Sequence, residues 1–168
     1  AIPYLEKALE ILPTQAARGS PYDLLTQIYE ETGQVDKLVE VRQRWWRAAP
    51  QFAENAHRIA SLLSDRDQPQ EAAKYLEEVM YVDPLHPETH QKLGDLYLQF
   101  SETEKAVREY TVFLSLSPVD GAAAHYRLAQ ALFESGDMQG ARNHVLLSLE
   151  IAPAYPGAQK LLLKLVRQ

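Results

Sequence analysis

Prolines recur along this chain at a nearly constant interval, and that interval restricts the fold more than any other feature of the sequence. Five of them follow short, mostly apolar runs and lie 37, 34, 34 and 35 residues apart: Pro13, Pro50, Pro84, Pro118 and Pro153. Proline lacks a backbone N–H and clashes with the preceding helical turn, so regular prolines mark regular helix ends. A period near 34 residues indicates a repeated unit of a few helices or strands.

Each period divides into two helices. The other five prolines lie where a helix is expected to begin, with Ser20 as a cap before the second of them: Pro3, Pro21, Pro69, Pro87 and Pro156. Turn-forming residues lie near the middle of each period, at 32–34, 65–68, 101–102 and 135–137. Apolar residues recur at helical spacing, as in Leu25 and Tyr29 or Leu93 and Tyr97. These patterns predict an all-α chain of amphipathic helix pairs that bury their apolar faces against one another.

The stretch from Leu93 to Tyr97, followed by Ala106, Tyr110, Phe113 and Pro118, resembles the tetratricopeptide repeat (TPR) family. This resemblance implies a right-handed α-α superhelix, a solenoid of antiparallel helix pairs. We expect one domain over residues 1–168, with full repeats at 19–52, 53–86, 87–120 and 122–155. Residues 1–13 resemble the second helix of a truncated repeat, and residues 156–168 a C-terminal capping helix. Because the chain starts in mid-repeat, we expect it to be a segment of a longer bacterial protein.

Two positions on the expected helix before Pro50 depart from the family pattern. Arg42 replaces a large apolar residue, and Trp45 replaces an alanine. We expect Val41 and Trp45 to share the packing, in a local exchange of small for large residues. The alternative is that Arg42 marks a solvent-facing break between two stacks. Because Trp45 and Trp46 are adjacent, at most one of them is expected to face the core fully, while the other covers the loop around Pro50.

In TPR proteins the first helices of successive repeats line a concave groove. The resemblance therefore implies a groove stripe, one residue beyond the core stripe, that is made of Asp23, Gln27, Glu30, His57, Ser61, Ser64, Gln91, Asp95, Leu98, Tyr126, Gln130 and Phe133. Lys160, Lys164 and Arg167 continue this stripe onto the last helix. The stripe mixes hydrogen-bonding groups with a few apolar ones and suits an extended peptide. The simpler interpretation is a solvated inner wall, in which Tyr126 and Phe133 pack against a neighbouring helix.

Composition and motifs exclude several classes of function. The net charge of -6 opposes binding to nucleic acid, no apolar run approaches the length of a membrane span, and no cysteine is present. Pro87 separates His86 from the helix that carries His90, so this pair is not expected to bind a metal. No phosphate-binding or metalloprotease motif occurs. We therefore expect a chain that is not an enzyme, with no cofactor and no metal, and composition assigns no compartment.

The resemblance implies a protein-interaction module that binds a peptide or protein segment. TPR domains that bind chaperone C-termini use a lysine and an asparagine where this chain has Asp23 and Gln27, so that ligand is not expected. Two alternatives stay open: a scaffold or spacer, and the non-catalytic C-terminal tail of a larger bacterial enzyme such as a metallopeptidase. RNA binding in the manner of pentatricopeptide repeats is disfavoured by the 34-residue period and the acidic charge. Self-association through the N-terminal end is a further expectation.

Overall fold

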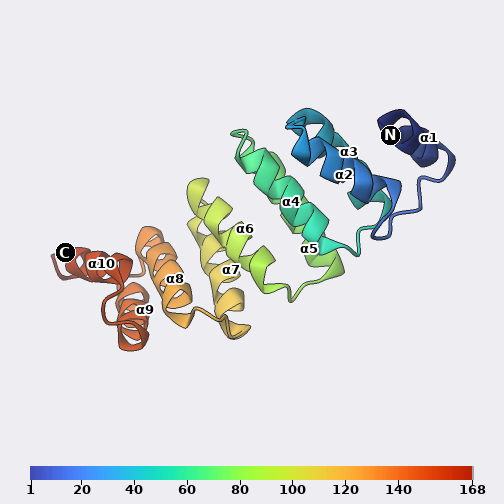
Figure 1. Ribbon diagram of the computed structural model, residues 1–168. Helices are drawn as coiled ribbons and strands as arrows, with labels where there is room; N and C mark the ends of the chain where they lie inside the picture. Colours follow the sequence, from blue (N-terminus) through green and yellow to red (C-terminus); the bar gives the residue numbers. More distant parts are fainter. Residues whose placement is uncertain (168) are drawn as a thin grey trace. The chain divides into compact units, whose positions relative to one another are not determined.

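The computed structural model describes residues 1–167, which form ten α-helices and no strand within that range (Figure 1). The helices are α1 (Ile2–Ile11), α2 (Pro21–Glu31), α3 (Val35–Ala48), α4 (Ala53–Ser64), α5 (Pro69–Val82), α6 (Pro87–Gln99), α7 (Thr103–Ser115), α8 (Gly121–Ser135), α9 (Met138–Ile151) and α10 (Pro156–Val166). The prediction of an all-α chain of helix pairs is confirmed for the described residues.

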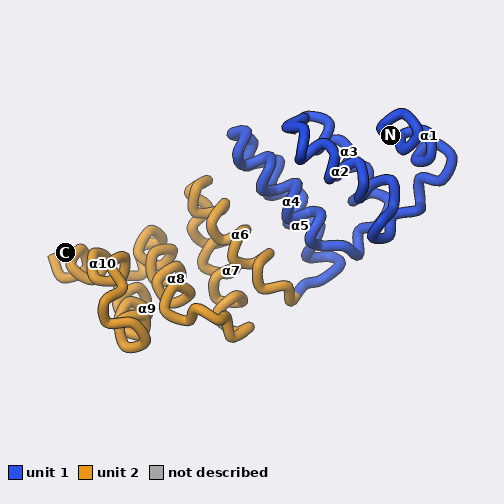
Figure 2. Tube along the Cα trace, in the orientation of Figure 1, with its two compact units in different colours: residues 1–84 blue, residues 85–168 orange. Residues whose placement is uncertain are grey.

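The chain divides into two compact units, residues 1–84 and 85–168 (Figure 2). The boundary lies after Pro84, in the loop that ends the second expected repeat. Within each unit every helix packs mainly on the helices next to it in the sequence. The grouping of all residues into one domain and the repeat boundaries stay predictions.

Prolines and short turns define the helix ends. Five helices carry proline at their first or second position, as expected, and the hydroxyl oxygen of Ser20 accepts a hydrogen bond from the Asp23 N–H at the start of α2. Each turn between the paired helices contains a residue with positive φ: Gly33, Asp67, Ser101 and Gly136. This left-handed residue returns the chain sharply enough for the second helix to pack on the first. In two of the four turns the residue with positive φ is an aspartate or a serine, so the presence of glycine does not by itself identify these turns.

In the first unit, aromatic residues build the core. Tyr22 stacks on Trp45 with ring centroids 6.3 Å apart, and both belong to a buried cluster with Leu9, Leu25 and Val41. The indole N–H of Trp45 donates to the carbonyl of Ala16 at 2.7 Å. This bond fixes the loop between α1 and α2. The expected sharing of core space by Val41 and Trp45 is confirmed.

The two adjacent tryptophans correct one expectation. Trp45 and Trp46 are both buried, with 8% and 3% of their surfaces exposed, so the expectation that at most one faces the core was wrong. Trp46 lies on a neighbouring stripe of α3, and its indole N–H donates to the Glu78 carboxylate of α5 at 2.6 Å. A helix with neighbours on two sides therefore buries both indoles, and Trp45 also packs beside the Pro50 loop, against Ala49 and Phe52.

In the second unit, α6 and α7 approach closely at Gly94. A Cβ atom on Gly94 would lie 2.6 Å from a ring carbon of Tyr110, closer than such atoms pack. The Tyr110 side chain is 1% exposed, and its hydroxyl donates to Asp95 at 2.6 Å. Burial and the Asp95 carboxylate raise the pKa of Tyr110, so the hydroxyl stays protonated as a donor. The ring has no room to move away from a larger residue at position 94.

We expect Gly94→Ala to lower the free energy of unfolding by about 1–2 kcal/mol, because overpacking against Tyr110 exceeds the gain in helix propensity. Urea unfolding of purified protein, followed by circular dichroism, measures this change. Gly121→Ala is the matched control, since a Cβ atom there would meet only the end of the Ile151 side chain, at 3.4 Å. A Gly94→Ala variant as stable as the parent would contradict the close packing of α6 on α7.

Candidate functional site

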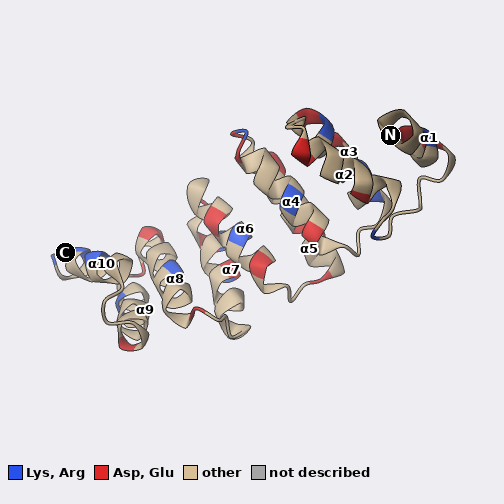
Figure 3. Cartoon of the chain, viewed as in Figure 1, with Lys and Arg blue, Asp and Glu red and all other residues tan. Residues whose placement is uncertain are grey.

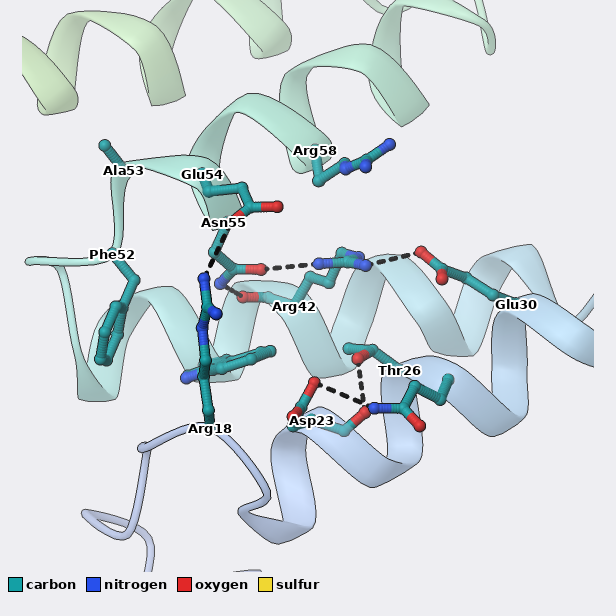
Figure 4. A pocket seen from close by; sticks show the side chains of 12 residues that line it. Arg18, Asp23, Thr26, Glu30, Arg42, Phe52, Ala53, Glu54, Asn55 and Arg58 are labelled. Carbon is teal, nitrogen blue, oxygen red and sulfur yellow. Dashed lines mark hydrogen bonds and ion pairs between the residues drawn. The ribbon is translucent and has the colours of Figure 1, made fainter. Parts of the chain in front are cut away.

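A cavity of about 710 Å³ opens in the first unit between α2 and α4, above α3 (Figure 4). Its lining combines the loop before α2 with these three helices: Arg18, Asp23, Thr26, Gln27, Glu30, Arg42, Trp45, Phe52, Ala53, Glu54, Asn55 and Arg58. Two first helices thus form the walls, and the second helix between them supplies the floor.

The floor is held by a buried polar network. Asn55 donates from its side-chain amide to the backbone carbonyl of Arg42 at 2.8 Å, and its Oδ1 accepts from Arg42 Nη1 at 3.2 Å. Arg42 Nη2 also donates to Glu30 Oε1 at 2.6 Å (Figure 4). The network links α2, α3 and α4 through charge-assisted bonds. Because Arg42 is 8% exposed, the alternative that it marks a solvent-facing break was wrong.

The rim of the cavity carries mixed charge. Arg18 and Glu54 form a long ion pair of 4.0 Å between side chains that are 89% and 74% exposed, and such pairs contribute little stability. Asp23 accepts from the Gly19 N–H at 2.8 Å and from Gln27 Nε2 at 3.3 Å. Arg58 is exposed and makes no ion pair with any residue that the structure describes. The rim therefore offers one uncommitted cation, Arg58, and one exposed carboxylate, Glu54, that is held only by a long ion pair.

The floor beneath the rim is aromatic at one end. The rings of Trp45 and Phe52 lie 6.4 Å apart, and Phe52 is partly exposed. Such an end suits an apolar side chain, while the Gln27 amide and the rim charges suit a polar backbone. The arrangement has the chemistry of a binding site. The described residues contain no group of three or more side chains that could hold a metal ion. Among the described helices, none has the length and apolarity of a membrane span.

The expected groove residues of the first unit separate into two groups. Asp23, Gln27 and Glu30 share the cavity described above. His57 lies one repeat further on, on α4, and is buried with 4% of its surface exposed. Ser61 is exposed and donates to the His57 carbonyl at 3.1 Å, while Ser64 is exposed near the end of α4. None of these three lines the cavity.

The expected groove residues of the second unit lie on α6 and α8. Gln91 and Leu98 are half-buried, and Asp95 pairs with Arg127 of α8 in addition to its bond from Tyr110. Tyr126 packs against Tyr155 with ring centroids 5.3 Å apart. Phe133 packs on the buried cluster that includes Leu161 and Leu165 of α10, and Gln130 donates to Glu134 at 3.1 Å. A binding role for these residues stays a prediction.

Several site features were missed by sequence reasoning. Asn55 and Arg58 lie two residues before and one residue after the stripe position of His57, so a count along a single stripe excludes them. A second missed feature is a histidine pair between α8 and α9, in which Nδ1 of His125 lies 3.0 Å from Nδ1 of His144. Burial lowers the pKa of both imidazoles, so the pair is expected to be neutral near pH 7.

We expect Asn55→Ala to reduce the free energy of unfolding by about 2 kcal/mol, because it leaves the buried Arg42 head group without one of its acceptors. Arg18→Ala is the control at the same cavity, and its exposed ion pair should change stability by less than about 0.5 kcal/mol. Chemical denaturation of both variants beside the parent measures the difference. Equal stability of Asn55→Ala and Arg18→Ala would show that the network does not hold the floor.

Comparison with known proteins adds a family match over part of the chain and a fold. Residues 92–158 match the tetratricopeptide repeat family. No curated protein matches the chain. Among solved structures, MamA from Desulfovibrio magneticus RS-1 is 18% identical over 87% of this chain and 82% of its own, with a TM-score of 0.75.

Two further structures share the fold. YrrB, described as a TPR protein with an unusual peptide-binding site, is 16% identical over 95% of this chain and 80% of its own, with a TM-score of 0.73. The first TPR domain of Spaghetti (RPAP3), bound to an HSP90 peptide, is 18% identical over 68% of this chain and 90% of its own, with a TM-score of 0.63. The shared fold shows that the chain is an all-helical protein of the TPR type, and its match to the tetratricopeptide repeat family extends over residues 92–158.

Proposed function

We propose that this chain is a protein-interaction module that binds a peptide or protein segment on the faces of its first helices. The observation that carries the proposal is the cavity between α2 and α4, which contains three of the residues expected from the sequence, Asp23, Gln27 and Glu30. Its volume of about 710 Å³ falls in the range of ligand sites in proteins.

The shape of the cavity favours a chain segment over a small molecule. Its rim residues Arg18, Glu54 and Arg58 are exposed, so a ligand can extend beyond the cavity onto α4. An extended backbone offers alternating donors and acceptors, which the Gln27 amide and the rim carboxylates complement. The aromatic end at Trp45 and Phe52 then takes one apolar side chain of the segment.

The firm floor supports the same proposal. Arg42, Asn55 and Glu30 are tied to one another across three helices, so the walls are set before a ligand arrives. A preformed site loses less conformational entropy on binding, which favours affinity for a flexible peptide. A spacer has no need for a polar network of this kind beneath an open cavity.

Proteins of the same fold support the class of function, not the ligand. YrrB has an unusual peptide-binding site, and the structure of the Spaghetti domain contains a bound HSP90 peptide. At sequence identities of 16% and 18%, the ligands of these proteins do not identify the partner of this chain. Asp23 and Gln27 differ from the lysine and asparagine that bind chaperone tails, so we propose a different segment for this cavity. The module is proposed to be non-catalytic and to use no metal or cofactor.

Self-association is a second candidate, favoured by an apolar hollow at the N-terminal end. Tyr4 is 81% exposed, and with Leu5, Leu24 and Ile28 it lines a hollow of about 350 Å³ between α1 and α2. A second copy or another apolar segment fits such a surface. Sedimentation of the chain across a range of concentrations distinguishes this contact from binding in the main cavity.

Partner capture tests the main proposal. The immobilised chain is incubated with a bacterial lysate beside a variant that carries Gln27→Ala and Arg58→Ala, two exposed cavity residues that are not part of the floor network. We expect proteins retained by the parent to fall at least roughly tenfold with this variant, because it removes contacts worth about 1.4 kcal/mol or more.

The matched control carries Gln70→Ala and Lys74→Ala, two exposed residues of the second helix α5. It should retain partners like the parent, and circular dichroism confirms that both variants stay helical. Loss of partners with the α5 control, but not with the cavity variant, would move the contact to the second helices. Absence of any retained protein would overturn the proposal and favour a scaffold or an enzyme's non-catalytic tail.

A further inference from the structure

Positive charge is concentrated at the C-terminal end of this acidic chain. Residues 1–120 contain twelve lysines and arginines against twenty acidic residues, whereas residues 121–167 contain five against three. Residues 156–167, which include α10, carry three cations and no acidic residue: Lys160, Lys164 and Arg167. Figure 3 shows this contrast as blue on α10 without red. Such an excess of one sign attracts a partner of the other sign.

These cations lie beside the aromatic stripe of α8. Gly157 packs directly under the Tyr126 ring, where an added Cβ would lie 2.7 Å from Tyr126 Cζ. Lys160 and Lys164 follow Gly157 at i+3 and i+7, so they share its stripe on α10 and border α8. Tyr126, Gln130 and Phe133 form the facing stripe of α8 by the same rule. The five side chains Tyr126, Gln130, Phe133, Lys160 and Lys164 constitute what we term the α8–α10 surface.

The cations of the α8–α10 surface have no internal counter-ion. Lys160 and Lys164 are exposed and make no ion pair among the described residues. The carboxylate of α8, Glu134, accepts a hydrogen bond from the Gln130 side chain at 3.1 Å. Arg127, the cation of α8, pairs with Asp95 instead. An incoming carboxylate therefore meets two lysines without displacing an existing partner, which makes its binding less costly.

The aromatic half of the surface supplies an apolar contact. Tyr126 and Phe133 are half-buried, with one side packed on the cluster of Ala158, Leu161 and Leu165 and the remainder accessible. Half-buried aromatic rings are held in place by their neighbours and lose little entropy when a ligand covers them. The surface thus combines partly buried aromatic rings with exposed cations.

We propose that the α8–α10 surface binds an acidic segment of a partner protein that carries an aromatic or large apolar side chain. The carboxylates of the segment lie against Lys160 and Lys164, and its apolar side chain covers Tyr126 or Phe133. Two lysines on a protein of net charge -6 are a poor match for a nucleic acid, which presents one phosphate after another. The inference rests on the proposed function only in that the partner is a protein segment, and it does not involve the cavity in the first unit.

A labelled peptide tests the inference directly. The probe is a fluorescein-labelled peptide of about ten residues, glutamates with one central phenylalanine, and its control replaces glutamate by glutamine. At about 0.05 M salt we expect the acidic peptide to bind with a Kd in the range of roughly 1–100 µM and the control to bind at least roughly tenfold more weakly. Raising the salt to about 0.5 M should weaken the acidic peptide further.

Matched variants locate the site. Lys160→Glu with Lys164→Glu should weaken the acidic peptide at least roughly tenfold, and Tyr126→Ala with Phe133→Ala should weaken it several-fold. Lys7→Glu with Lys74→Glu makes the same change in net charge at exposed residues of the first unit and should leave binding unchanged. The cavity variant with Gln27→Ala and Arg58→Ala should also leave it unchanged, so failure of this inference and failure of the proposed function are distinguishable.

Four results would overturn the inference. Equal loss of binding with both charge-reversal variants would show non-specific attraction. Absence of binding at low salt would show that the surface takes no acidic segment. Tighter binding of a single-stranded oligonucleotide would assign the surface to nucleic acid. Competition of the peptide with self-association, seen as a fall in sedimentation mass on adding it, would assign the surface to a second copy of the chain.

Discussion

Each helix of this chain has an apolar face that only the adjacent helices can bury, and the structure depends on that stacking. Between α6 and α7 the approach is close enough that Gly94 has no room for a side chain over Tyr110. Between α2 and α3 the stack is made by Tyr22 on Trp45. These contacts are local in sequence. The hydrophobic core therefore extends from one helix to the next along the chain and is not gathered around one centre.

Stacking in series leaves the outer faces of the helices free for other functions. In the first unit, α2 and α4 stand on either side of α3, and the space between them is the cavity. The network of Arg42, Asn55 and Glu30 holds α2, α3 and α4 in this arrangement. An apolar side chain at position 42 would instead pack into the core. A departure from the family pattern thus becomes the floor of the candidate site. This coupling of fold and site explains why Arg42 is both charged and buried.

Most of the helices were predictable from the sequence, because prolines and the period of apolar residues act locally. The placement of Trp46 was not, since its burial depends on Glu78 of another repeat, 32 residues away. The resemblance to the TPR family placed Asp23, Gln27 and Glu30 on one face of a helix, and all three line the cavity. Asn55 and Arg58 were missed because a cavity between helices collects residues from several stripes. A repeat pattern therefore predicts which face of a helix is available, and only packing between helices determines which residues meet on it.

The central claim is that partners bind to the first helices and not to the second. A photo-crosslinking amino acid introduced at one glutamine at a time tests it, with Gln27 and Gln130 on first helices and Gln70 and Gln139 on second helices. After irradiation in a bacterial lysate, the account predicts cross-linked partners from Gln27, Gln130 or both, and none from Gln70 and Gln139. Cross-links that arise mainly from Gln70 or Gln139 would contradict it.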